Sequence, residues 1–320
     1  MSDAAPRLPD RFTEPTTGRR IDLLGYQAAN RRNSWLLALV TMALLVAIAY
    51  LLAQVTDPGA TLFFVGVALL IGAGQAVAGF WFSDRIALAA AGARPATVEE
   101  HRYLVNVSEA VAIGAGVPMP KVYVIDSPAP NAFATGRDPE HAAIAVTTGL
   151  IELLDRQELE GVVAHEMAHI RNYDVRFMSM LVATLGALLV LRDLFLRWGY
   201  FGGGGRRRGG RDSNGKGQGI ALVVLLVLLV VSPIVAALVR FAVSRQREYL
   251  ADAAAAWITR NPEGLARALE KLRAYSGPRL EVSEAVRSMF FVNPELNLNA
   301  TGMLATHPPI EERIRRLRRM

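Results

Sequence analysis

The sequence predicts a mainly α-helical membrane protein with an N-terminal transmembrane helical hairpin, an α+β domain built on a small sheet, and a second pair of hydrophobic helices. Two uncharged runs, at 33–56 and 60–83, are each long enough for the roughly 20-residue helix that crosses a bilayer. Short alternating segments between residues 121 and 147 are typical of strands. Hydrophobic residues make up 52% of the chain and its mean hydropathy is +0.26, which is high for a soluble protein.

The net charge of +6 is unevenly distributed, with basic clusters at 19–32, 206–216 and 313–319. Each cluster lies beside an apolar segment or in an amphipathic tail, as suits an anionic membrane surface. Nucleic acid is the competing partner, but no basic–aromatic interleaving or known binding motif supports it, so none is expected. The chain has no cysteine, which excludes disulfides and leaves nitrogen and oxygen ligands for any metal. This fits a cytosol-facing protein.

Residues 1–32 are expected to form a flexible basic arm, because their first twenty residues mix Pro, Thr, Asp and Arg without periodicity. Residues 33–83 then form the transmembrane hairpin. A cleaved signal peptide is the alternative for the first run, but its length and the second span that follows argue against it. Four glycines in the second span could allow close helix packing: Gly66, Gly72, Gly74 and Gly79.

The turn of the hairpin carries no Lys or Arg, whereas both flanks do. By the positive-inside rule, the N-terminus and the chain after Arg85 face the cytoplasm. We therefore expect a multi-pass protein of the cell's inner membrane, with its folded domain on the cytoplasmic side.

Residues 84–177 are expected to form the first half of that domain. Thr97 is placed to cap a helix that runs to about Gly114. Strands are expected at 121–125, 131–135 and 143–147, where branched and apolar residues alternate between turn signals. This small sheet leads directly into the next helix.

Residues 178–240 are expected to form the second hydrophobic pair, from runs at 177–191 and 220–239 joined by a Gly/Arg-rich loop at 202–219. If both runs cross the membrane, the basic loop lies outside, against the charge rule. If neither crosses, the pair packs against the domain or the bilayer, and both options stay open. The loop nearly matches a phosphate-binding P-loop at 210–217, but its last residue and its context do not fit.

A helix after this sheet carries a candidate metal site. Asp155 lies where an N-cap belongs and Glu158 falls three residues later, as in a capping box. His165 and His169 are four residues apart and share a helix face, so both can bind one metal ion. Glu166 follows the first histidine, where it could act as a general base on a water at that ion. The alternative is an amphipathic helix whose histidines are only hydrogen-bonded.

Residues 241–320 are expected to form the second half of the domain, which supplies a third ligand. Glu248 and Asp252 share one face of a helix expected at 244–256. Glu248 would complete a site for one zinc ion per chain, and Asp252 could accept the spare N–H of a ligating histidine. A solvated acidic face, offset by nearby arginines, is the alternative.

The motifs H-E-M-A-H at 165–169 and R-E-Y-L-A-D at 247–252 resemble the HtpX heat-shock membrane zinc proteases, relatives of the CAAX prenyl proteases within the gluzincin group. The resemblance extends to the paired N-terminal spans, the strand that begins Asn131-Ala-Phe-Ala, and the segment 306–314. It implies a zincin-like catalytic domain, a cytoplasmic active site, and a stress-response role in degrading damaged membrane proteins. It also implies specific roles: zinc ligands His165, His169 and Glu248, and catalytic base Glu166.

The remaining candidates are weaker. A strand beside a protease helix can hold an extended peptide by backbone pairing, which makes Asn131, Ala132 and Phe133 candidate substrate-binding residues. A sheet that serves only as scaffold is equally open. His307 could donate a hydrogen bond to a developing oxyanion, or could simply cap the last helix. The sequence predicts only structural roles for the other residues. Arg313 is expected to form a salt bridge, and His101 and His141 to lie at surface or core positions. Residues 310–320 are expected to form a basic amphipathic helix on the membrane face.

These features predict a membrane-bound zinc-dependent endopeptidase that acts on misfolded or damaged proteins. A CAAX-type processing protease and a non-enzymatic zinc-binding membrane scaffold are the alternatives. The expected partners are protein or peptide substrates and the lipid bilayer. The sequence leaves the substrate, the cleavage preference, the oligomeric state and the regulation open.

Overall fold

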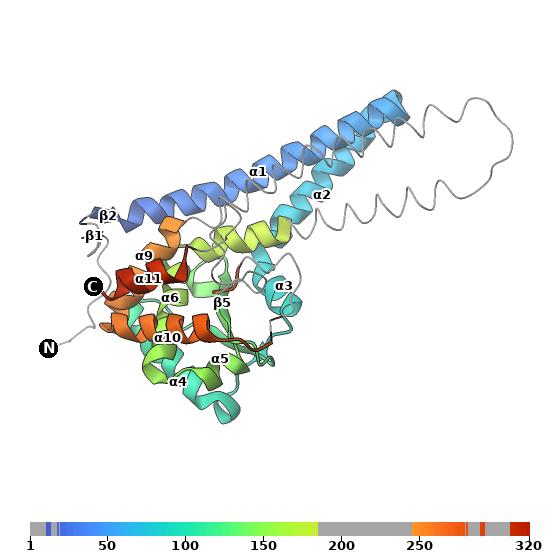
Figure 1. Ribbon diagram of the computed structural model, residues 1–320. Helices are drawn as coiled ribbons and strands as arrows, with labels where there is room; N and C mark the ends of the chain where they lie inside the picture. The colour runs from blue at the N-terminus through green and yellow to red at the C-terminus, as the bar shows by residue number, and fades with distance from the viewer. Residues whose placement is uncertain are drawn as a thin grey trace.

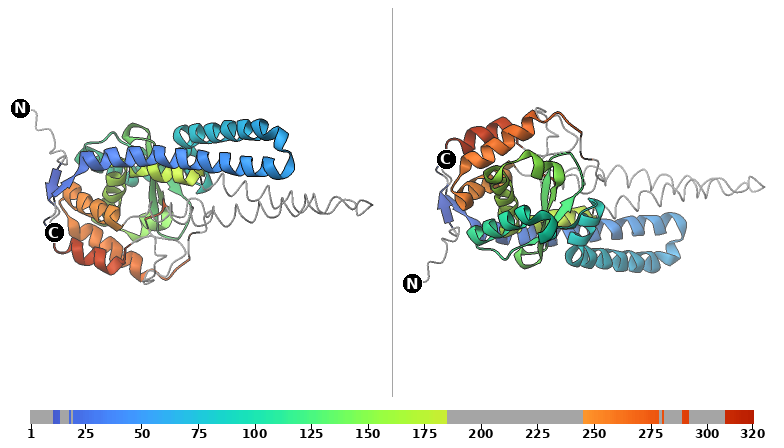
Figure 2. Two further views of the ribbon diagram at one scale, coloured as in Figure 1. Left: turned by 90° about the horizontal axis from the view of Figure 1, so that it is seen from above. Right: turned by 90° about the horizontal axis from the view of Figure 1, so that it is seen from below.

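The computed structural model begins with a long helix, α1 (Leu23–Thr56), which runs antiparallel to α2 (Thr61–Trp81) and projects with it from the folded domain (Figures 1 and 2). A 3-10 turn, η1 (Pro58–Ala60), joins them. Their apolar windows have hydropathies of 2.7 and 2.0, and only 28% and 17% of each window is buried. Because most of this apolar surface is uncovered, the pair differs from the core helices of a soluble protein. The predicted N-terminal hairpin is confirmed.

The structure describes residues 11–13, 18, 20–184, 245–278, 280, 289–291 and 308–320. Most of the expected hydrophobic pair lies outside these residues, including the loop at 202–219 and the run at 220–239. The run at 177–191 begins within a helix described over 174–184. His307 also lies outside the described residues.

The flexible arm expected at 1–32 is wrong for residues 20–32. Strand β2 (Arg20–Asp22) pairs with β1 (Arg11–Thr13), and α1 begins directly after it. The Asp22 carboxylate caps α1 by accepting the N–H of Gly25 at 3.3 Å. Leu23 is buried in a cluster with residues of two later helices. The polar, basic composition of residues 20–32 does not indicate that α1 begins at Leu23 or that its first turns pack against the domain.

Two of the four glycines in α2 lie at close helix contacts. A side chain at Gly72 would collide with the sulfur of Met42 on α1. A Cβ at Gly79 would lie 3.1 Å from the Cβ of Ala183. Gly66 and Gly74 have no such neighbour within 4 Å, so the packing prediction is confirmed for two positions only.

The main sheet has four strands in the order β3-β4-β6-β5: Arg94–Pro95, Lys121–Ile125, Ala142–Thr147 and Ala132–Gly136. The β4–β6 pair is parallel and the other pairs are antiparallel. The three strands expected from the sequence are confirmed to within one residue. Strand β5 lies at an edge of this sheet and beside the histidine helix, α6 (Arg156–Arg171).

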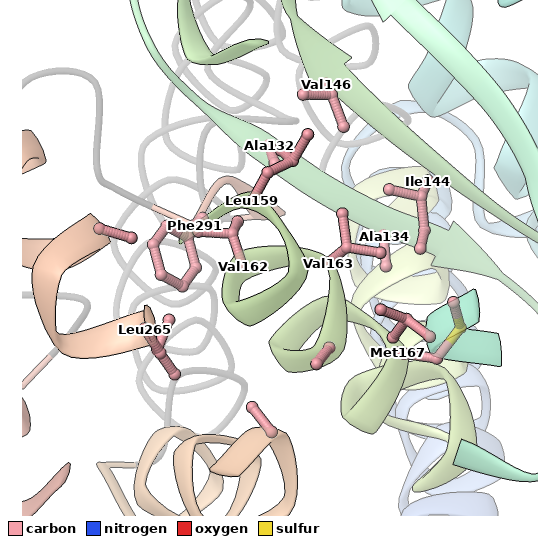
Figure 3. Packing of buried hydrophobic residues seen from close by; sticks show 14 of the residues in the cluster. Ala132, Ala134, Ile144, Val146, Leu159, Val162, Val163, Met167, Leu265 and Phe291 are labelled. Atoms are coloured by element: carbon pink, nitrogen blue, oxygen red, sulfur yellow. The ribbon is translucent and has the colours of Figure 1, made fainter. Parts of the chain in front are cut away.

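Three helices pack against α6: α4 (Val98–Ala115), α9 (Arg245–Thr259) and α10 (Pro262–Ala274). The short helices α3 (Ser83–Ala90) and α5 (Thr148–Leu153) pack against the sheet, α11 (Ile310–Leu317) packs against α9 and α10, and a 3-10 turn, η2 (Pro139–His141), precedes β6. Thr97 caps α4 as predicted, by accepting the N–H of Glu100. The sheet covers one side of α6, where Val163 faces the strands, and Leu265 of α10 lies on the other side (Figure 3). Gly161 permits this approach, because a Cβ there would meet the backbone nitrogen of Leu265 at 2.8 Å.

The C-terminal helix α11 packs into the domain, so the expected membrane-surface position of 310–320 is wrong. Ile310, Ile314 and Leu317 are buried in the main hydrophobic cluster. The basic Arg318 pairs with acidic residues of α10. The apolar face that suggested lipid contact therefore covers the protein core.

Candidate metal centre

Helix α6 is held firmly at its start, before the histidines. The Asp155 carboxylate accepts the N–H of Glu158 at 3.0 Å, and the Glu158 carboxylate accepts the N–H of Asp155 at 2.8 Å. This is the predicted capping box. Lys271 of α10 adds an ion pair to Glu158 at 2.6 Å. The register of α6, and with it the direction of both histidines, is fixed from outside the site.

Three residues from two helices far apart in the sequence converge on one point. The Nε2 atoms of His165 and His169 are 3.1 Å apart. Each lies 3.7 Å from a carboxylate oxygen of Glu248 on α9. Within the described residues, His165, His169 and Glu248 each offer one ligand atom, and these three atoms all lie within 4.8 Å of one another. The structure thus brings the three expected ligands together.

This geometry fits a zinc ion. Two nitrogens that each lie 2.0–2.1 Å from a tetrahedral zinc are about 3.3 Å apart, close to the separation observed. Two imidazole lone pairs at 3.1 Å repel each other unless a cation or a proton lies between them. The donor set of two imidazoles and one carboxylate is one that zinc uses in catalytic sites.

A buried carboxylate orients the first histidine. Nδ1 of His165 lies 2.9 Å from Asp252, which in turn accepts two hydrogen bonds from Arg313 at 2.7 and 2.9 Å. With Nδ1 donating to Asp252, the Nε2 lone pair of His165 points to the site. Burial lowers the pKa of His165 to about 4, which keeps this imidazole neutral and able to bind a metal. Burial would raise the pKa of Asp252, but Arg313 and His165 lower it below its ordinary value.

The second histidine has an equivalent partner that sequence reasoning missed. Nδ1 of His169 lies 3.0 Å from Asp174, which also accepts a 2.8 Å hydrogen bond from Asn30 of α1. Burial would lower the pKa of His169, but Asp174 and the nearby glutamates raise it to about 9. Asp174 follows a chain reversal at Asn172 and Tyr173, where Tyr173 has φ of 60°. Its position five residues after His169 was the only sequence signal, and Asn30 fell in the segment expected to be flexible.

Glu166 lies inside the same charged cluster. Its side chain is 3% exposed, and its charge contributes to raising the pKa of both His169 and Arg313. Arg313 is itself 1% exposed and its NH1 lies 3.6 Å from Glu248. The predicted salt-bridge role of Arg313 is confirmed.

The aromatic ring of Phe291 lies beside the site. The ring of Phe291 lies 4.9 Å from that of His165, and the Arg313 guanidinium carbon lies 4.9 Å from the Phe291 ring. The backbone N–H of Phe291 donates to the carbonyl of Ala132 at 2.8 Å. The edge of β5 therefore already accepts a backbone donor close to the candidate centre.

The expected substrate-binding residues present backbone rather than side chains. Phe133 is fully buried, with its ring 4.9 Å from that of Phe290. Asn131 is also buried, and its N–H donates to the Thr147 hydroxyl at 2.8 Å. The Ala132 N–H donates to the Asn131 side-chain oxygen at 3.0 Å, and its carbonyl accepts from Phe291, so a substrate that pairs here would displace these partners.

The other described histidines lie outside this centre. His101 is 3.8 Å from Glu100 and its side chain is 16% exposed, which is between the surface and core positions expected. His141 does have neighbours at ligand spacing, Asp138 and Glu140, contrary to expectation. That group is largely exposed, and Asp138 already contacts Nδ1 of His141 at 2.7 Å.

Comparison with known proteins places the chain in a family. Residues 99–320 match peptidase family M48. A protein named "Protease HtpX homolog" from Caldanaerobacter subterraneus subsp. tengcongensis is 46% identical over 293 residues, 91% of this chain and 96% of that protein. Its namesake in Thermoanaerobacter pseudethanolicus is 44% identical over 303 residues, 93% and 98% of the two chains. The crystal structure of S. mikatae Ste24p superimposes with a TM-score of 0.48 at 22% identity, covering 89% of this chain and 66% of that one. The chain therefore belongs to peptidase family M48, within its HtpX group.

Proposed function

We propose that this protein is a membrane-bound zinc-dependent endopeptidase that hydrolyses peptide bonds in misfolded or damaged membrane proteins. The observation that carries the proposal is the convergence of His165, His169 and Glu248, with the two Nε2 atoms 3.1 Å apart. Membership of a peptidase family and the two long apolar helices support it.

Zinc in this site would be held by His165, His169 and Glu248, and it supplies a Lewis acid that polarises a carbonyl and makes a water nucleophilic at neutral pH. Glu166 is the general base: its carboxylate takes a proton from the attacking water and returns it to the leaving amine. Asp252 accepts the Nδ1–H of His165, and Asp174 accepts the Nδ1–H of His169.

The substrate backbone pairs with the edge of β5 at Asn131–Phe133 in this proposal. Support comes from the position of β5 at a sheet edge beside α6, and the substrate N–H would take the place of the Phe291 N–H at the Ala132 carbonyl. An added strand gains affinity from main-chain hydrogen bonds and so tolerates many substrate sequences. His307, at the start of the C-terminal segment, is the proposed hydrogen-bond donor to the developing oxyanion.

The catalytic domain faces the cytoplasm in this proposal, and the chain crosses the inner membrane several times. Arginines flank the hairpin on the side of the domain, as the positive-inside rule requires. A quality-control role then follows, because an active site at the membrane surface can reach damaged membrane proteins.

Cleavage of an unfolded protein tests the proposal. The purified full-length protein in detergent, with zinc, should cut casein at many sites, and a chelator should stop it. Glu166→Gln should keep its zinc and lose cleavage. Intact casein together with a single cut near the C-terminus of a prenylated peptide would favour the CAAX-type alternative, and zinc binding without cleavage of either substrate would favour the scaffold.

A further inference from the structure

Arginine and aromatic side chains meet where the apolar hairpin joins the domain. The guanidinium carbon of Arg176 lies 5.5 Å from the ring centre of Trp35 on α1 and 4.7 Å from that of Phe80 on α2. The guanidinium carbon of Arg137, the residue directly after β5, lies 6.0 Å from the ring centre of Phe80 and 4.2 Å from that of Trp81. We refer to these five residues as the arginine–aromatic cluster.

Arg176 is a buried cation without a local counter-ion. Its side chain is 9% exposed, it forms no ion pair within 4.0 Å among the described residues, and its Nε has no hydrogen-bond partner there. Arg31 lies one helical turn before Trp35 on α1, with its guanidinium carbon 5.0 Å from the ring centre of Tyr173, and its charge acts on Arg176 more strongly than that of Asp138. Asp138 is also shared with Arg137 and His141. Aromatic faces attract a cation but leave its charge in place, so the cluster retains an excess of positive charge.

The cluster lies at the level expected for lipid headgroups. Trp35 lies near the start of the apolar stretch of α1, and Trp81 is the last residue of α2. Both tryptophans are about half exposed, and their rings flank Phe80. Tryptophans concentrate at the membrane–water interface, and arginines there bind phosphate through paired N–H donors.

We propose that Arg31, Arg137 and Arg176 bind the phosphate of an anionic phospholipid headgroup, with Trp35 and Trp81 against the lipid. The phosphate supplies the negative charge that the buried guanidinium lacks. This inference does not depend on the metal centre or on the proposed peptidase activity.

Lipid retention tests the proposal. The full-length protein is purified in detergent and exposed to equal amounts of phosphatidylglycerol and phosphatidylcholine, and bound lipid is measured by native mass spectrometry. The wild type should retain phosphatidylglycerol preferentially. Arg176→Gln should reduce that retention about tenfold, the loss expected for a hydrogen bond between charged groups. Arg31→Gln should also reduce the retention of phosphatidylglycerol. Because Arg31 is exposed, this substitution should leave the fold intact.

Arg102→Gln is the matched control, because it removes one positive charge from an exposed position on α4 in the folded domain. It should retain phosphatidylglycerol like the wild type. Equal retention of the two lipids, or equal loss in Arg102→Gln and Arg31→Gln, would overturn the proposal. Inorganic phosphate is the second arm: if it alone raises the unfolding temperature as much as phosphatidylglycerol does, the ligand is free phosphate and the lipid assignment is wrong.

Discussion

The side-chain amide of Asn30, in the first apolar helix, donates a 2.8 Å hydrogen bond to Asp174, the carboxylate that holds His169. Asn30 is 2% exposed, and its amide oxygen accepts a hydrogen bond from Arg247 at 3.0 Å. The helix that leaves the domain as half of the apolar hairpin thus also supports the candidate centre.

Replacing Asn30 with leucine should weaken zinc binding. The change keeps the number and branching of the side-chain heavy atoms but removes the donor that positions Asp174, so zinc affinity should fall about tenfold, the lower end of the effect for groups behind a metal ligand. The control is Gln27→Leu on the same helix, whose amide reaches only the carbonyl of Arg171 in the described structure. Competition with a chromogenic chelator measures both variants, and equal affinities would rule out this role for Asn30.

Asp252→Asn should destabilise the fold as well as the centre. The substitution removes the anion that pairs with Arg313, which is 1% exposed. Breaking one partner of a buried ion pair costs about 3–5 kcal/mol, measurable by denaturant unfolding in detergent. Glu263→Gln, which removes a half-exposed partner of Arg318, should change little. Similar unfolding midpoints for the two variants would contradict this reading.

The same ion pair predicts a pH dependence. The pKa of Asp252 is lower in the folded protein than in the unfolded chain, so folding favours its ionised form. Its contribution to stability is complete above the ordinary aspartate pKa of about 3.9 and is lost as the pH falls through the lower folded pKa. Acid unfolding of the wild type and Asp252→Asn should therefore differ most near neutral pH and converge in acid. A constant difference across this range would count against it.

Leu317→Ala tests the position of the C-terminal helix. Leu317 is fully buried in the main hydrophobic cluster, so truncation should cost about 2–5 kcal/mol of unfolding free energy. Arg319→Ala, two residues later and exposed, is the control and should have little effect. If both variants unfold like the wild type, the helix does not pack as described.

Local patterns were enough to predict the parts of the site that lie on one element. The capping box at Asp155 and Glu158 and the shared face of His165 and His169 follow from helix geometry alone. The prediction that Glu248 is a metal ligand depended on a family resemblance, because the residue spacing within α9 does not show that α9 packs against α6.

The supporting residues could not be predicted in this way. Asp174 reaches His169 only because the chain reverses at Asn172 and Tyr173. Asn30 depends on how α1 packs against the domain. The amphipathic pattern of 310–320 predicts a helix, which the structure confirms over Ile310–Leu317, but periodicity shows only that an apolar face exists. Whether that face covers lipid or protein is decided by tertiary packing.

Removal of the metal should destabilise the folded protein. At a zinc concentration 100 times its Kd, binding adds about 2.7 kcal/mol to stability, so a chelator should lower the unfolding temperature of the wild type. His165→Ala should show no such response, because one of the three ligands is gone. An identical unfolding temperature with and without chelator would mean that the folded protein holds no zinc.

The central claim is that α6 and α9 form one metal centre, and zinc content tests it most directly. Metal analysis after dialysis should find one zinc per chain in the wild type and in Glu166→Gln. His169→Ala, on α6, and Glu248→Gln, on α9, should both lose it. If Glu248→Gln retains one zinc per chain with unchanged affinity, the two helices do not share a site and the account is contradicted.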